Sequence, residues 1–123
     1  MNVLLSIKPE FASEIFKGTK KFEYRRIIFR EPVERIIVYA SSPIKMVIGE
    51  FFIKDILFED LDSLWSKTKH ESGISRKYFY LYFSDKEKGY AIKVGRLIKY
   101  RTPRPLHDLY GIKAPQSFAY INR

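Results

Sequence analysis

The sequence predicts an α+β domain that is mainly β, built on a small sheet that curls into a barrel. Five stretches carry strand patterns, and two of them, residues 46–58 and 89–100, are long and contain an internal glycine. A glycine inside a strand is typical of a bulge or a tight bend in a curved sheet. The strands and helices alternate too irregularly for a doubly wound fold, so a curled sheet or barrel is favoured.

The first part of the chain predicts a strand, a helix and two further strands, in that order. Residues 3–7 form a short apolar run, which is typical of a central strand. Pro9 suits the first position of a helix, and Gly18 suits the residue that ends it. Residues 20–26 alternate in polarity as a half-buried strand does, and residues 35–40 form a β-branched run that is typical of a buried strand.

The second part predicts two helices between the long strands and an irregular tail. Asp60 or Asp62 can cap the first of these helices, and Ser75 can cap the second. In the second long strand the alternation slips at Gly95, which indicates a bulge. The tail from Arg101 onward holds three prolines and predicts irregular structure that is anchored to the body by its apolar side chains.

Length and composition favour one domain over residues 1–123. The chain is long enough for one core, and 46% hydrophobic residues argue against disorder. There is no cysteine, and His70 and His107 lack the spacing of a helical zinc pair, so we expect no metal site. Phosphate loops and dinucleotide fingerprints are absent, and we expect no cofactor. The N-terminus lacks the pattern of a signal peptide and no apolar run reaches membrane-spanning length, so we expect a cytoplasmic protein.

The charge balance favours a polyanionic partner. Lys and Arg number 23 against 14 acidic residues, which gives a formal net charge of +9 and an isoelectric point near 9.7. A positive field attracts phosphate-rich molecules at long range. The alternative is a solvated, lysine-rich surface without a specific partner.

The charge cluster of residues 20–26 is the strongest candidate for a site. On a strand, Glu23 shares a face with Lys21 and Arg25 and can pair with either. The pattern alone favours a solvated, charge-paired sheet face, and the alternative is a pocket in which the cations bind an anion or a carbonyl group. In an ideal strand Lys20 and Glu23 point to opposite faces. A shared site therefore requires a turn or bulge at the start of the strand, or else Lys21 is the partner of Glu23.

Two further places have the composition of a binding site. Lys8 lies between a strand and a helix N-terminus, where backbone N–H groups favour anions. Ser41 and Ser42 follow a buried strand, where loop side chains often line a cleft or simply form a turn. Aromatic and basic residues interleave in residues 76–80 and 99–101, a mixture that fits contact with nucleic acid through stacking and phosphate pairing.

Several motifs resemble the ASCH family of the PUA-like superfamily. The opening "LLSIKPEFASEIFKGTKKFEYRR" is similar to that family's first strand, its lysine-proline helix start and its Gly-x-Lys-x-x-Glu-x-Arg strand. The segments "VYASSP", "GEF", "KGYAIKV" and "APQSFAYI" also look like small archaeal and bacterial members. The resemblance spans nearly the whole chain and rests at its start on these residues: Lys8, Pro9, Gly18, Lys20, Glu23 and Arg25.

The resemblance implies a β-barrel of five or six strands with two to three packed helices and a cleft lined by the Gly-x-Lys-x-x-Glu-x-Arg strand. PUA-like relatives bind RNA or modified bases, so it also implies an RNA or nucleotide-like ligand. Lys8, Lys20 and Arg25 would contact phosphate or base carbonyls, while Glu23 would orient them or accept a hydrogen bond. Other expected ligand-binding residues, on the strand and at the rim of the cleft, are Lys21, Ser41, Ser42 and Ser117.

Enzymes of the same family supply the main alternative. One branch hydrolyses acetylcytidine with a lysine, a threonine and a glutamate, and another cleaves RNA. Lys20 matches the lysine of the first branch and Glu71 falls in the region of its glutamate, but Glu23 occupies the threonine position. A carboxylate is a poorer acyl acceptor than an activated hydroxyl, so Glu23 with Lys20 would act in proton transfer. A protein-interaction module whose basic face is incidental is a third interpretation.

Overall fold

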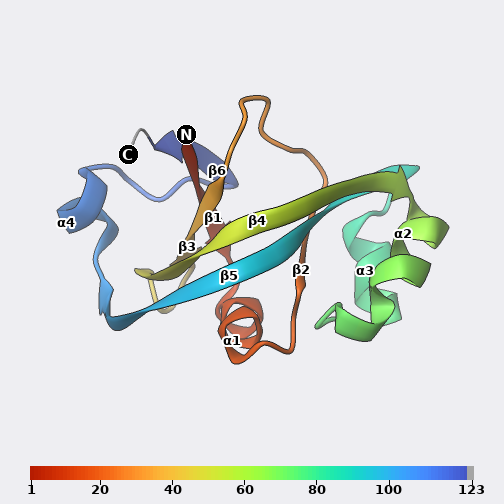
Figure 1. Cartoon of the computed structure of the whole chain (residues 1–123), viewed down its shortest axis with the longest axis horizontal. Coiled ribbons are helices and arrows are strands. Elements are labelled where there is room, and N and C mark those ends of the chain that lie inside the picture. Colours follow the sequence, from red (N-terminus) through yellow and green to blue (C-terminus); the bar gives the residue numbers. More distant parts are fainter. Residues whose placement is uncertain (122–123) are drawn as a thin grey trace.

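The fold consists of one six-stranded sheet with helices at its two ends and in its middle (Figure 1). A computed structural model describes residues 1–121. Within that range the strands and helices are, in chain order, β1 (Asn2–Ile7), α1 (Pro9–Lys17), β2 (Phe22–Arg25), β3 (Arg35–Ala40), β4 (Met46–Asp60), α2 (Leu61–Thr68), a 3-10 turn η1 (Lys69–Glu71), α3 (Arg76–Tyr82), β5 (Lys88–Arg104), α4 (Leu106–Tyr110) and β6 (Phe118–Ile121).

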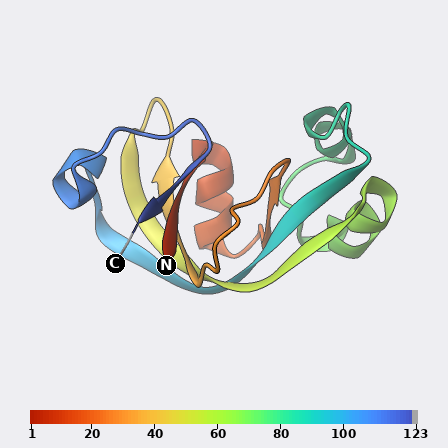
Figure 2. The same ribbon diagram turned by 90° about the horizontal axis from the view of Figure 1, so that it is seen from above.

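The sheet is mixed and strongly curved. Its strand order is β2-β5-β4-β3-β1-β6, with β1 parallel to β3 and the other neighbours antiparallel. In Figure 2 the long strands β4 and β5 bend so that β3, β1 and β6 stand on one side and β2 on the other, with α1 between the two sides. The mainly β, curled architecture predicted above is confirmed. The ladder of the described residues stays open between its two edge strands, β2 and β6.

Bulges produce the bends in β4 and β5. The pairing of β4 with β5 shifts register between Phe51 and Ile53, opposite Gly95. A Cβ atom at Gly95 would lie 2.7 Å from the carbonyl oxygen of Phe52, so the backbones approach there more closely than any side chain allows. A second shift lies beside Gly49, where a Cβ atom would come within 2.6 Å of the Phe16 ring of α1. The two bulges predicted at the internal glycines are thus confirmed.

Helix α1 fills the concave side of the sheet. Its ends agree with the prediction: Pro9 is its first residue, and Gly18 follows it in the left-handed conformation, with φ of 85°. Ala12 and Ile15 are fully buried against the inward-facing residues of β1 and β3. Removing this apolar surface from water stabilises the contact by roughly 25 cal/mol for each Å² buried. The core therefore holds α1 beside the end of β1.

A second apolar cluster attaches α2 and α3 to the far end of the sheet. Phe22 and Tyr24 of β2 pack there on Leu64 of α2 and on Phe79 and Phe83. Both helices begin as predicted. The carboxylate of Asp60 accepts a hydrogen bond from the N–H of Ser63, and the hydroxyl of Ser75 accepts one from Tyr78. These caps satisfy N–H groups that the first turn of a helix leaves without partners.

The prediction of an irregular tail from Arg101 was wrong. Strand β5 continues to Arg104, a short helix α4 follows, and β6 pairs antiparallel with β1. The C-terminal segment is ordered because Leu106 is buried in a cluster with Leu4 and Ile37, and because β6 forms one edge of the sheet. Its regular structure depends on contacts with strands up to about a hundred residues away, which the local proline pattern does not indicate.

Candidate functional site

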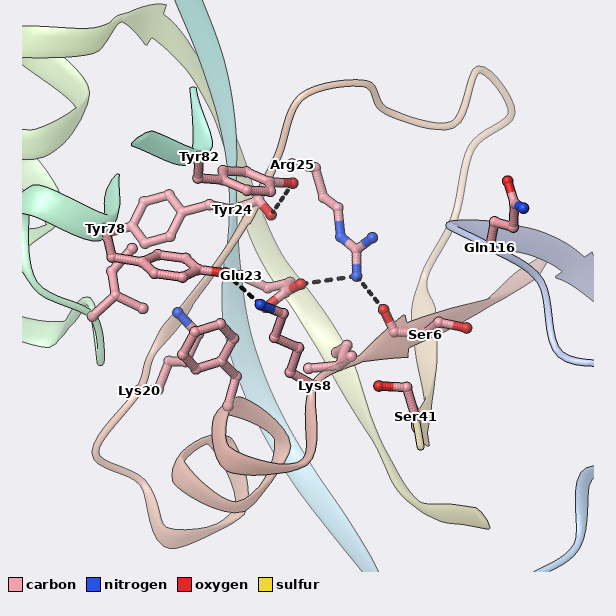
Figure 3. A pocket seen from close by; sticks show the side chains of 13 residues that line it. Ser6, Lys8, Lys20, Glu23, Tyr24, Arg25, Ser41, Tyr78, Tyr82 and Gln116 are labelled. Carbon is pink, nitrogen blue, oxygen red and sulfur yellow. Dashed lines mark hydrogen bonds and ion pairs between the residues drawn. The ribbon is translucent and has the colours of Figure 1, made fainter. Parts of the chain in front are cut away.

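A pocket opens beside β2, where the edge of the sheet faces α1, α3 and the end of β1. Its volume is about 260 Å³. Its wall is formed by these residues: Ser6, Ile7, Lys8, Phe11, Lys20, Glu23, Tyr24, Arg25, Ser41, Ile74, Tyr78, Tyr82 and Gln116. In Figure 3, Tyr78 and Tyr82 approach from one side, Ser6, Ser41 and Gln116 lie on the other, and Glu23 and Arg25 stand between them.

Arg25 bridges the open edge of the sheet. It lies on β2, and its Nη2 atom donates a hydrogen bond to the carbonyl oxygen of Ser6 on β1 at 2.9 Å. Its Nη1 atom lies 3.5 Å from the hydroxyl of Ser117, just before β6. One guanidinium thus connects the two sides of the sheet that no backbone ladder joins in the described residues. This position puts a cation in the wall of the pocket, between Glu23 and Ser6 (Figure 3).

Glu23 and Arg25 form a buried ion pair. Their closest atoms, Arg25 Nη2 and Glu23 Oε2, are 2.9 Å apart, and the two side chains are 11% and 8% exposed. They share a face of β2 because successive side chains of a strand alternate, while Phe22 and Tyr24 enter the core on the other face. The Nε atom of Arg25 is buried and has no hydrogen-bond partner among the described residues. An unsatisfied buried donor costs about 1–3 kcal/mol, so an acceptor that reaches it would be bound favourably.

Lys20 is a buried lysine. Its residue is 1% exposed, its ammonium donates a hydrogen bond to the carbonyl oxygen of Ser72 at 2.7 Å, and it lies 4.9 Å from the ring centre of Tyr24. Burial lowers the pKa of Lys20 from 10.5 to about 8, and the nearby Glu23 carboxylate offsets only part of that shift. A fraction of Lys20 is therefore neutral near pH 7, which an exposed lysine is not.

The turn before β2 lets Lys20 and Glu23 share one pocket. The strand begins at Phe22, so Lys20 lies outside the regular alternation that would send the two side chains to opposite faces. The expected turn at the start of the strand is present. Lys21 is the residue that points elsewhere: its ammonium pairs with Glu71 at 3.2 Å, and both side chains are about half exposed.

The mouth of the pocket carries a lysine and two tyrosines. Lys8 is exposed at the start of α1, and its ammonium lies 3.2 Å from the hydroxyl of Tyr78. The rings of Tyr78 and Tyr82 are nearly parallel, with an interplanar angle of 9° and centres 6.4 Å apart. Burial raises the pKa of Tyr82 and raises that of Tyr24 to about 12, so both keep their protons at neutral pH. The pocket thus combines aromatic faces with cations.

The structure brings together most of the residues selected from the sequence. Lys8, Lys20, Glu23, Arg25 and Ser41 line the pocket. Ser117 lies beside it, within reach of Arg25.

Lys21 and Ser42 do not line this pocket. Their part in ligand binding stays a prediction. The side chain of Lys21 lies outside the pocket and pairs with Glu71, and Ser42 is exposed in the loop after β3. Glu71 pairs with Lys21 and not with Lys20, so it also lies outside the pocket.

Eight wall residues are absent from the site selected on the sequence: Ser6, Ile7, Phe11, Tyr24, Ile74, Tyr78, Tyr82 and Gln116. Tyr78 falls in the aromatic and basic segment 76–80 described above, and Tyr82 follows it by one helical turn. Their spacing of four residues puts them on one face of the helix, but only the position of α3 beside β2 turns part of that face into a pocket wall. The hydroxyl of Ser6 donates a hydrogen bond to the carbonyl oxygen of Pro115. Ser6 lies in the otherwise apolar run of residues 3–7, and no local pattern indicates that it lines a pocket.

Neither a metal site nor a membrane helix is found in the described part of the chain. Within residues 1–121, no three acidic or histidine side chains gather where they could hold a metal ion. None of the helices there has the length and apolar character needed to cross a membrane. The cytoplasmic location stays a prediction.

Comparison with known proteins identifies close relatives. Residues 5–99 match the family described as ASCH domain. The chain is 34% identical over 128 residues to an ASCH domain-containing ribonuclease of Zymomonas mobilis, with 98% of this chain and 84% of that protein covered. The crystal structure of ASCH from Zymomonas mobilis has a TM-score of 0.90 and 31% identity, over 99% of this chain and 88% of that chain. Variants of that protein with one tyrosine replaced by phenylalanine or one serine by alanine superimpose equally well.

Two further relatives are much longer than this chain. It is 30% identical over 120 residues to a protein named ATP synthase subunit alpha, and 31% identical over 124 residues to one named large ribosomal subunit protein uL22, both from Ureaplasma parvum. Each match covers 97% of this chain but only 15% and 39% of the respective protein. The chain thus spans a minor part of the length of these two relatives.

Proposed function

This chain belongs to the ASCH domain family, and from that membership we propose that it binds single-stranded RNA and cleaves it in the pocket beside β2. The observation that carries this proposal is Lys20, a buried lysine with a pKa lowered to about 8 in a pocket that also holds an Arg–Glu pair and half-buried tyrosine rings. Perturbed pKa values of this kind gather at sites where protons are transferred.

The relatives support an RNA substrate. The ribonuclease of Zymomonas mobilis aligns with almost the whole of this chain. A tyrosine and a serine were replaced in the structures of the ASCH protein from the same organism. The pocket described here is lined by three tyrosines and two serines, Tyr24, Tyr78, Tyr82, Ser6 and Ser41.

The pocket has groups for each part of a nucleotide. A base that displaces the Lys8 ammonium, which lies 5.3 Å from the ring centre of Tyr78, can stack on this half-buried ring. Such stacking is worth about 1–3 kcal/mol for one base. Lys8 and Arg25 supply positive charge for the phosphate, and the carboxylate of Glu23 can accept a hydrogen bond from an exocyclic amine. A volume of about 260 Å³ suits one nucleotide unit and not a duplex.

The proposed reaction is an internal phosphoryl transfer. The ribose 2′-oxygen attacks the adjacent phosphorus, and the bond from phosphorus to the 5′-oxygen of the next nucleotide breaks. Neutral Lys20 accepts the proton of the 2′-hydroxyl, and the ammonium of Lys8 gives a proton to the leaving 5′-oxygen. Arg25 stabilises the charge that develops on the phosphoryl oxygens. The products are a 2′,3′-cyclic phosphate and a 5′-hydroxyl end.

A pair of lysine variants tests the proposal. We expect Lys20→Met to lose RNA cleavage by at least about a hundredfold, the usual contribution of an acid–base group. We expect Lys86→Met to keep the wild-type rate, because Lys86 is exposed and does not line the pocket. Methionine has a similar length and removes a buried charge, so the first variant should stay folded, which circular dichroism would check. Replacing the 2′-hydroxyls by hydrogen should abolish cleavage by the wild type.

The outcome also separates the alternatives. Equal cleavage by both variants would contradict the role of Lys20. If the wild type binds RNA without cleaving it, the protein is an RNA-binding protein and the proposed cleavage is wrong. Release of acetate from acetylcytidine without cleavage of RNA would favour the amidohydrolase. The structure lends that activity less support, since Glu71 is paired with Lys21 and Glu23 with Arg25.

A further inference from the structure

A second, larger hollow lies next to the pocket and is rich in basic side chains. It has a volume of about 710 Å³ and lies between the end of α1, the turn before β2 and the bent part of β4 and β5. We call it the basic hollow and define it by Lys21, Lys54, Lys93 and Arg96, with Glu71 as the acidic residue in its wall. The reaction proposed above uses none of these residues.

The bulge in β5 gathers two of the cations. Lys93 and Arg96 are three residues apart, and in a regular strand they would point to opposite faces. The register shift beside Gly95 adds one residue to β5 relative to β4, and the side chains of Lys93 and Arg96 both line the same hollow. Strand β5 contains six Lys or Arg residues and no Asp or Glu along its length.

The positive charge of the basic hollow is poorly compensated. Glu71 pairs with Lys21, whereas Lys54, Lys93 and Arg96 form no ion pair with any residue described by the structure. The guanidinium of Arg96 lies 4.6 Å from the ring centre of Phe52 and so covers the aromatic face in this wall. The hollow therefore offers charge and no free stacking surface, which suits a phosphate backbone better than a base.

The basic hollow adjoins the pocket. Lys20 belongs to the wall of both, so the two meet at the turn that joins α1 to β2. An RNA strand with one nucleotide in the pocket can continue past this turn into the hollow. We propose that the basic hollow binds the phosphates of the RNA segment that flanks the cleaved nucleotide, independently of its sequence. This inference rests on the proposed RNA substrate.

A matched pair of double variants tests the inference. The test variant is Lys54→Gln with Lys93→Gln, and the control is Lys86→Gln with Lys113→Gln, two exposed lysines that line neither cavity. Both changes remove the same charge. The probe is a fluorescent single-stranded RNA of about 12 nucleotides, a length within the range that one small domain can track. Its riboses carry 2′-O-methyl groups, so that attack by the 2′-oxygen is blocked.

We expect the test variant to bind this RNA about tenfold more weakly at low salt than the control does. The slope of the logarithm of affinity against the logarithm of salt concentration is negative, and its magnitude should be smaller by about 1.4 in the test variant, since each phosphate contact on a single strand contributes about 0.7. Cleavage of a dinucleotide, whose single phosphate is the one that is cleaved, should be the same for both variants.

The possible failures are distinguishable. Equal affinities and slopes for test and control variants would overturn the inference while RNA binding itself stands. If the test variant cleaves the dinucleotide more slowly than the control, the lysines of the hollow affect the reaction itself, and the inference that they bind only the flanking phosphates is wrong. If the wild type neither binds nor cleaves RNA, the proposed function fails, and the inference fails with it.

Discussion

Replacing Gly73 by alanine should displace Lys20 from its buried position. Gly73 adopts a φ of +67°, and a Cβ atom added there would lie 2.6 Å from the Cβ and Cγ atoms of Lys20 and 2.9 Å from its Cδ atom. Carbon atoms do not approach each other so closely in folded proteins, so the lysine stem must shift. The preceding carbonyl, that of Ser72, accepts the hydrogen bond from the Lys20 ammonium. One short segment thus positions both ends of this side chain.

The size of the effect follows from two separate contributions. The left-handed backbone conformation costs a non-glycine residue about 1–2 kcal/mol. A displaced Lys20 also loses a charge-assisted hydrogen bond worth about 1.5–3 kcal/mol, part of which the ammonium regains from water. We therefore expect Gly73→Ala to lower the free energy of unfolding by about 2–4 kcal/mol. As burial decreases, the pKa of Lys20 should rise from about 8 towards 10.5.

Gly111→Ala provides the matched control. Gly111 has a φ of +65°, but no atom lies within 4 Å of the position that its Cβ would occupy. This variant carries the backbone cost alone, about 1–2 kcal/mol. Urea denaturation gives the two free energies of unfolding, and NMR titration of the lysine Nζ signals gives the pKa of Lys20. Equal destabilisation by the two variants, with Lys20 still titrating near 8, would refute the positioning role of Gly73.

Two further predictions concern the buried charges. Lys20 has a lower pKa in the folded protein, so the unfolded chain binds more protons between about 8 and 10.5, and stability should rise with pH in that window. Relative to Lys20→Met, wild-type stability should increase by about 2 kcal/mol from about pH 7 to about pH 9.5, and parallel urea-denaturation curves would contradict this. Arg25→Met leaves the Glu23 carboxylate buried without its partner and should cost about 3–5 kcal/mol, whereas Lys67→Met, which breaks a more exposed pair with Glu59, should cost at most about 1 kcal/mol. Equal losses in thermal or urea denaturation would show that the Glu23–Arg25 pair behaves as a surface pair.

The sequence by itself determined those features that depend on near neighbours. The limits of α1, the cap at Ser75 and the bulge at Gly95 all follow from interactions within a few residues, which also narrow the cap of α2 to Asp60 or Asp62. The common face of Glu23 and Arg25 also follows from the alternation of a strand. Each of these features has a local signal because the interaction that produces it spans at most one turn of helix or one pleat of a strand.

Only the tertiary structure decided what surrounds those residues. Ser72 lies 52 positions from Lys20 in the sequence, Tyr78 lies 70 positions from Lys8, and Ser117 lies 92 positions from Arg25. The depressed pKa of Lys20 arises because segments remote in sequence exclude water from it, and no local pattern records that burial. The tail became ordered for the same reason, because β6 finds its partner in β1 at the other end of the chain.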